Sequence, residues 1–155
     1  MSFKLPQDYL DFFTALEKHE VEYAVAGAFA MAAWGYIRAT GDIDVWVLPT
    51  PENATRLIRA LTEFGAPLDA VSARDFSTPG TVFQLGQPPL RIDILTSLDG
   101  VAVPKSLAPL CKESKAFGPR LPVLVLDILI ENKKATGRAK DLADVQALQK
   151  LKEMK

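Results

Sequence analysis

The chain has 155 residues, a formal net charge of −1 and a hydrophobic fraction of 48%. These values predict one globular domain, residues 1–155, and exclude the strong basic field that holds proteins to nucleic acid regardless of sequence. One cysteine excludes an intramolecular disulfide and one histidine excludes the usual Cys/His zinc sites, so we expect a cytoplasmic protein. The longest apolar stretch, residues 121–130, is too short to span a bilayer, so we expect no membrane association.

Hydrophobic spacing predicts alternating helices and strands at the start of the chain. Residues 7–18 carry apolar side chains at helical spacing, and residues 23–26 form a short apolar run typical of a buried strand. Gly27 ends this strand, and residues 28–34 are predicted to form a helix. This order aims the free N–H groups of the helix start at whatever lies above the strand, which suits an anion.

The next predicted strand, residues 42–48, carries charge on one face. Asp42 and Asp44 alternate with apolar residues, so both carboxylates point the same way. Carboxylates gathered at the edge of an apolar sheet repel one another unless a cation neutralises them, and divalent ions prefer such hard oxygen ligands. The strand therefore suggests a metal site.

A third aspartate follows in a predicted hairpin. Thr50 is placed to cap a helix that ends at Gly65. Residues 81–85 and 90–95 are then predicted as paired strands, which brings Asp93 into the same sheet as the first two aspartates.

The C-terminal part is predicted to be mainly helical. Residues 96–120 show little regular pattern apart from a short strand expected around residues 116–117. Helices are expected over residues 125–135 and from residue 139 onwards. Together these elements predict an α/β (α+β) domain with a mixed sheet of four to six strands, helices mainly on one side and C-terminal helices.

Several candidate residues also have a structural interpretation. Asp42 and Asp44 could cap turns or form surface ion pairs, and Gly27 could serve helix–strand packing alone. Asp93 and the glycine turn together favour the metal site. Arg38 is open between a phosphate contact and a salt bridge to one of the aspartates.

Two acids on the last predicted helix are interpreted as structural. Asp141 is expected in the first turn, where the helix dipole favours an acid, and Asp144 is expected to pair with a nearby Arg or Lys. The basic residues before them are open between a solvated face and a nucleotide contact.

The ordered series of these features resembles the nucleotidyltransferase superfamily with the polymerase-beta-like fold. The series consists of the glycine turn, an Arg-x-Thr-x-Asp-x-Asp string at residues 38–44, a third aspartate on a neighbouring strand and the segment at residues 125–145. It is similar to small bacterial members that include components of toxin–antitoxin pairs. The resemblance covers most of the chain and implies transfer of a nucleoside monophosphate from an NTP to a hydroxyl of a protein, RNA or small-molecule acceptor.

The resemblance also implies a role for each candidate residue. Asp42, Asp44 and Asp93 would be catalytic and would hold Mg²⁺, or Mn²⁺, in a two-metal site. Asp93 would also accept the proton of the attacking hydroxyl. The nucleotide-binding set would be Gly27, Ala28, Arg38, Lys133, Lys134 and Arg138. Many members have Gly-Ser or Gly-Gly where this chain has Gly27-Ala28, so backbone contacts to phosphate remain and a hydroxyl contact is absent.

Two other classes of function fit parts of this pattern. A protein-binding module of the same fold, similar to an antitoxin, would act by covering a toxin-like partner protein. A structural metal-binding domain would explain the aspartates but neither the glycine turn nor Arg38. For the nucleotidyltransferase, an RNA partner or a homodimer is also compatible with the sequence, because we recognise no separate acceptor-binding domain in it.

Overall fold

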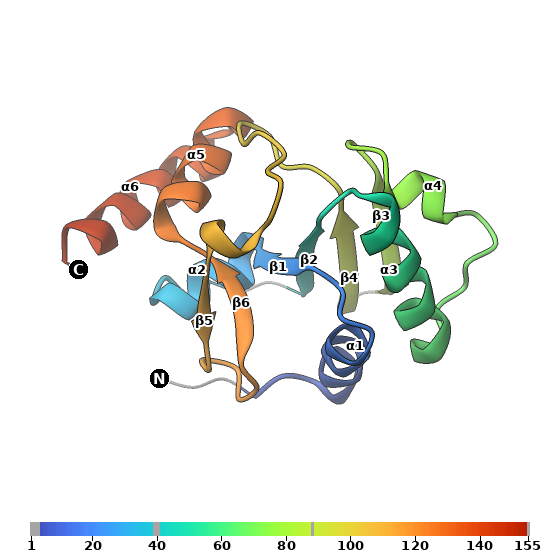
Figure 1. Ribbon diagram of the computed structural model, residues 1–155. Coiled ribbons are helices and arrows are strands. Elements are labelled where there is room, and N and C mark those ends of the chain that lie inside the picture. Colours follow the sequence, from blue (N-terminus) through green and yellow to red (C-terminus); the bar gives the residue numbers. More distant parts are fainter. Residues whose placement is uncertain (1–3, 39–40, 88, 155) are drawn as a thin grey trace.

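Six strands form one mixed sheet within residues 4–38, 41–87 and 89–154, which the computed structural model describes (Figure 1). The strands are β1 (Tyr23–Ala26), β2 (Asp42–Val47), β3 (Val82–Gln87), β4 (Leu90–Leu95), β5 (Cys111–Ser114) and β6 (Leu121–Leu124). Their order across the sheet is β3-β4-β2-β1-β6-β5. β2 is parallel to β4 and β1 is parallel to β6, whereas the other neighbours are antiparallel. The predicted α+β class with a mixed sheet is confirmed.

The helices pack in two groups around this sheet. They are α1 (Gln7–Lys18), α2 (Gly27–Trp34), α3 (Pro51–Phe64), α4 (Ala73–Phe76), α5 (Leu126–Thr136) and α6 (Ala139–Glu153), with a short 3₁₀ turn, η1 (Ala108–Leu110). α3 contacts both α1 and α4, while α5 contacts α6 and α2; Figure 1 shows α5 and α6 together at one end of the molecule. No helix in the described residues is both long and apolar enough to cross a membrane.

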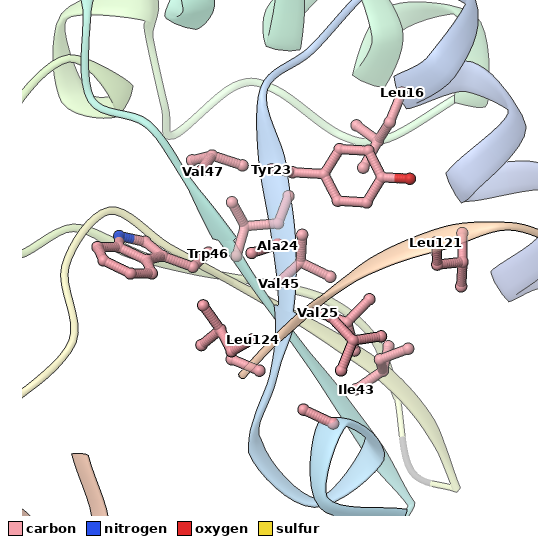
Figure 2. Packing of buried hydrophobic residues seen from close by; sticks show 14 of the residues in the cluster. Leu16, Tyr23, Ala24, Val25, Ile43, Val45, Trp46, Val47, Leu121 and Leu124 are labelled. Atoms are coloured by element: carbon pink, nitrogen blue, oxygen red, sulfur yellow. The ribbon is translucent and has the colours of Figure 1, made fainter. Parts of the chain in front are cut away.

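The centre of the core is the pair of strands β1 and β2. All four residues of β1 are buried, because β2 and β6 flank it in the sheet. On β2 the side chains of Ile43, Val45 and Val47 are buried, whereas Asp42 and Asp44 are only partly buried. Figure 2 shows the apolar side chains of these strands packed with those of β6. Charge is therefore confined to the first half of one face of β2.

Helix boundaries follow the expected capping chemistry. Thr50 caps α3 by accepting a hydrogen bond from the backbone N–H of Asn53 at 3.2 Å, and Pro51 occupies the first turn. Gly65 ends the helix with a φ of 92°, a conformation that favours glycine. The predicted span of this helix is confirmed, and α2 begins one residue earlier than predicted, at Gly27.

The prediction of a strand around residues 116–117 is wrong. The strand in this region is β5, which pairs with β6, and residues 116–117 lie in the turn that joins them. The backbone N–H of Gly118 donates to the carbonyl of Lys115 at 3.0 Å, and Gly118 has a φ of 103°. Phe117 is buried from this turn, so its apolar character reflects core packing and not sheet pairing.

Candidate active site

Two parallel strands place the three predicted aspartates on one face of the sheet. Asp42 and Asp44 are two residues apart on β2, and Asp93 lies on the neighbouring strand β4. The register pairs Asp44 with Asp93 and Asp42 with Arg91, and alternate positions of a strand share a face. The structure therefore brings together the three carboxylates to which the sequence pointed.

An arginine that the sequence reasoning missed lies among these carboxylates. Arg91 Nη2 is 2.7 Å from Asp42 Oδ2, and Arg91 Nε is 3.3 Å from Asp93 Oδ1. The signal was present in the sequence, because a residue two positions before Asp93 on a strand must share its face. The carboxylate face thus carries its own cation.

Burial and the charges of neighbouring carboxylates raise the pKa values of two of the carboxyl groups. Burial, followed by the charge of Asp93, raises the pKa of Asp44 to about 6. The opposing charges of Lys133 and Arg91 reduce this shift. Burial also raises the pKa of Asp93, and the neighbouring Asp42 adds to that shift. Ionising Asp44 and Asp93 costs free energy, and a bound cation would offset this cost.

Gly27 lies against the carboxylate of Asp44 at the junction of β1 and α2. Ala26 pairs with Asp44 across β1 and β2, which brings Gly27, the next residue, close to Asp44. Gly27 has a φ of 61°, and a Cβ atom there would collide with the Asp44 carboxylate. Ala26 precedes the helix without capping it through a side chain. The glycine is therefore required for the close approach of the helix start to Asp44.

A polar cleft of about 360 Å³ opens beside Asp44 and Gly27. α5 and the start of α6 contribute its polar wall, which includes Asn132, Lys133 and Arg138. Lys134 is exposed and does not line this cleft, because consecutive helix positions point about 100° apart. The structure brings two of the three predicted C-terminal cations to the site and leaves the third outside.

The cations near the cleft are anchored by two buried acids on α6. Asp144 lies 3.3 Å from the guanidinium of Arg38 and 3.7 Å from Lys133 Nζ. Asp141 is 2.7 Å from Arg138 and 3.5 Å from Lys133. Arg38 thus forms a salt bridge to Asp144 on α6, a partner that neither of the two sequence-based alternatives named.

Both acids hold the positions that the sequence suggested. Asp141 lies in the first turn of α6, and Asp144 pairs with Arg38 and Lys133. Burial alone would raise the pKa of Asp141, but hydrogen bonds from Arg138 and the charge of Lys133 hold that pKa well below its ordinary value. The network fixes Lys133 between the acids of α6 and the cleft.

A second, more apolar hollow of about 330 Å³ is lined by other residues of the α2 start. Gly27 lines the polar cleft, whereas Ala28 and Phe29 line this hollow together with Phe117. Tyr9 also lines it, and its hydroxyl donates to the carbonyls of Gly41 at 2.8 Å and Arg91 at 3.1 Å. No pattern in the sequence indicated this role of Tyr9, which ties α1 to β4 and to the residue before β2.

Several solved structures of other proteins share the fold of this chain. TM1012 from Thermotoga maritima, provisionally assigned as a nucleotidyltransferase, aligns with a TM-score of 0.59 at 17% identity over 99% of this chain and 98% of its own. The lincosamide antibiotic adenylyltransferase LnuA, with lincomycin bound, aligns with a TM-score of 0.63 at 11% identity over 97% and 99%. The antibiotic-resistance factor ANT(2'')-Ia gives 0.59 at 14% identity over 92% and 80%.

The chain has the nucleotidyltransferase fold. No family model matches the sequence, and no curated protein matches it significantly. At identities of 11–17% the likeness concerns the fold, and the site must be judged from its own residues.

The donor set of this nucleotidyltransferase fold suits a hard divalent cation. Asp93 Oδ1 is buried and accepts no hydrogen bond within the described residues, and the other donors are carboxylate oxygens, which Mg²⁺ prefers. Among residues 4–38, 41–87 and 89–154, no three or more Asp, Glu, His or Cys side chains are arranged to hold a metal ion. In this arrangement Arg91 engages oxygens of both Asp42 and Asp93. The chemistry fits a metal, and the side-chain positions are those of an arginine-paired site.

Proposed function

We propose that this protein is a nucleotidyltransferase that moves a nucleoside monophosphate from an NTP to a hydroxyl acceptor. The observation that carries the proposal is the pairing of Asp44 with Asp93 across β2 and β4, beside a cleft that contains Gly27 and Lys133. Carboxylates whose pKa values are raised by burial and by neighbouring carboxylates destabilise the metal-free fold, and such groups gather at functional sites.

The proposed reaction is a displacement at the α-phosphorus of the NTP. The acceptor oxygen forms a bond to this phosphorus, the bond to the bridging oxygen breaks, and pyrophosphate leaves. Mg²⁺ held by Asp42, Asp44 and Asp93, in a two-metal arrangement, would neutralise phosphate charge and lower the pKa of the hydroxyl. Asp93 accepts the hydroxyl proton as the general base.

The chain's own groups bind the triphosphate in this proposal. Backbone N–H groups at the start of α2 bind a phosphate, since no side chain caps them and the helix dipole favours an anion. Ala28 contributes only its backbone. Lys133 and Arg138, on the cleft wall, neutralise the departing pyrophosphate. Arg38 acts indirectly, because it shares Asp144 with Lys133.

The acceptor is a hydroxyl of a small molecule, an RNA or a protein. LnuA is an antibiotic adenylyltransferase with lincomycin bound. This supports counting small molecules among the candidate acceptors. We place the acceptor in the apolar hollow that Phe29 and Phe117 line, since Ala28 and Phe29 of the α2 start line it while Gly27 lines the polar cleft.

A label-transfer assay tests the proposal. The protein is incubated with each of four NTPs labelled at the α-phosphate, Mg²⁺, and separate pools of RNA, protein and small metabolites. We expect Mg²⁺-dependent label in one pool, lost in Asp44→Asn and kept in Asp127→Asn, which changes an exposed carboxylate on α5. Absence of any NTP binding at millimolar concentration, combined with tight binding of a partner protein, would contradict the proposal in favour of a binding module.

A further inference from the structure

The guanidinium of Arg91 lies where a cation of the carboxylate site would lie. It approaches Asp42 Oδ2 to 2.7 Å and Asp93 Oδ1 to 3.3 Å, and its side chain is 29% exposed. Asp42 is its register partner on β2, and Asp93 is two residues further along β4. One side chain therefore spans both strands and engages one oxygen from each of two carboxylates.

Arginine and a divalent ion are competitors at these oxygens. An Mg²⁺ ligand oxygen sits about 2.0–2.1 Å from the ion, within a complete octahedral shell. Guanidinium ion pairs to the same oxygens cannot persist inside that shell, and the two cations repel each other. Arginine cannot relieve the conflict by losing its proton, because its pKa is too high. Its side chain must therefore move for the ion to bind.

The sheet leaves the guanidinium a direction in which to move. The register partner of Arg91 on β3 is Gly86, and cross-strand partners in an antiparallel pair lie on the same face. The next position on that face, away from β2, thus carries no side chain. Gly86 has a φ of 76°, and a Cβ atom there would meet the carbonyl oxygen of Leu90 at 2.6 Å, so a larger residue does not fit this backbone.

We propose that Arg91 is an internal counter-ion of the metal-free site, which competes with the divalent ion for Asp42 and Asp93 and withdraws when the ion binds. This inference rests on the proposed function, because it takes the three aspartates as metal ligands. The arginine neutralises the carboxylate face while no ion is present, and it lowers the affinity for the ion by the strength of its own ion pairs.

Mn²⁺ binding without nucleotide tests the proposal on a readout other than activity. Free Mn²⁺ is followed by electron paramagnetic resonance during titration of the wild type, Arg91→Met, Asp44→Asn and Arg56→Met. Arg56→Met removes the same charge from an exposed position on α3. We expect Arg91→Met to bind Mn²⁺ at least about tenfold more tightly than the wild type, since charge-assisted hydrogen bonds are lost from the competitor. Arg56→Met should match the wild type.

A second measurement uses the wild type and does not depend on the folding of Arg91→Met. The Nε–H resonance of Arg91, assigned by its loss in Arg91→Lys, should shift as Mg²⁺ is added and the guanidinium leaves the carboxylates. An unchanged resonance at saturating Mg²⁺ would overturn the inference. Arg91→Met binding equal to or weaker than wild type would also overturn it, while a loss of binding in Asp44→Asn would keep the proposed metal site. No Mn²⁺ binding by any variant at millimolar concentration would overturn both.

Discussion

Gly27 and the carboxylate of Asp44 are in such close contact that no Cβ atom fits between them. The contact joins the start of α2 to the carboxylate strand, since Gly27 follows the register partner of Asp44. The glycine turn and the first aspartate pair, which are far apart in the sequence, are therefore one structural unit.

Gly27→Ala should both destabilise the fold and weaken nucleotide binding. A positive φ costs an alanine about 1 kcal/mol, and overpacking adds roughly 1–3 kcal/mol. Gly65→Ala is the matched control, because Gly65 also has a positive φ but open space around its Cβ direction. Urea unfolding and NTP titration measure both effects. Equal unfolding free energies for the two variants would show that the contact with Asp44 is unimportant.

Asp44→Asn should stabilise the metal-free protein at neutral pH. The pKa of Asp44 is raised from 3.8 to about 6 by burial and by Asp93, so the folded state binds more protons than the unfolded state between these values. Stability must then fall as pH rises from about 4 to 6, by about 3 kcal/mol for this group. Asn does not titrate and avoids this loss.

Unfolding in EDTA at pH 4 and pH 8 checks the sign. The gain in unfolding free energy of Asp44→Asn over the wild type should be near zero at pH 4 and largest at pH 8, and taking this difference cancels the titrating groups that do not interact with Asp44. Added Mg²⁺ should stabilise the wild type more than the variant. A variant that is less stable than wild type at pH 8 would refute the electrostatic cause.

Lys133→Met should weaken NTP binding at least about tenfold, whereas Lys134→Met should leave it unchanged. Lys133 lines the cleft and Lys134 does not, and a charge-assisted phosphate contact contributes about 1.5–3 kcal/mol. Calorimetric titration with ATP and with adenosine separates the phosphate contact from folding, because adenosine affinity should be unaffected. Equal losses for both ligands would indicate a structural effect only.

Asp144→Asn should destabilise the protein strongly. Asp144 is buried and is shared by Arg38 and Lys133, and breaking a buried ion network costs about 3–5 kcal/mol because charges remain uncompensated. Asp127→Asn, at an exposed ion pair with Lys152, should cost less than about 1 kcal/mol. Denaturant unfolding of both variants gives the comparison, and a similar small cost would mean that water screens the network.

The sequence was sufficient to predict the carboxylate strands, the glycine turn and most helices, because their signals are local. Alternation places Asp42 and Asp44 on one face, and Thr50 and Gly65 mark the ends of α3. The parallel register of β2 with β4 pairs Asp44 with Asp93. These strands are separated by α3, α4 and β3, so no local sequence signal predicts their register.

The errors and omissions also have physical causes. β5 and β6 pair with each other but were not predicted. Pro122 and the charged residues Lys112 and Glu113 interrupt the apolar pattern that indicates a strand. Arg38 was left open between a phosphate contact and a salt bridge to one of the aspartates, and its observed partner Asp144 comes from a helix about 100 residues later. Such ion pairs arise from tertiary packing, which sequence spacing does not encode.

Anomalous diffraction from crystals grown with Mn²⁺ and a non-hydrolysable NTP analogue tests the central claim most directly. We predict an anomalous peak bounded by Asp42, Asp44 and Asp93, with the triphosphate against the α2 start and the Arg91 guanidinium displaced. A peak elsewhere, or none at saturating Mn²⁺ while Arg91 still pairs with Asp42 and Asp93, would contradict the assignment of these carboxylates as a metal-dependent nucleotidyl-transfer site.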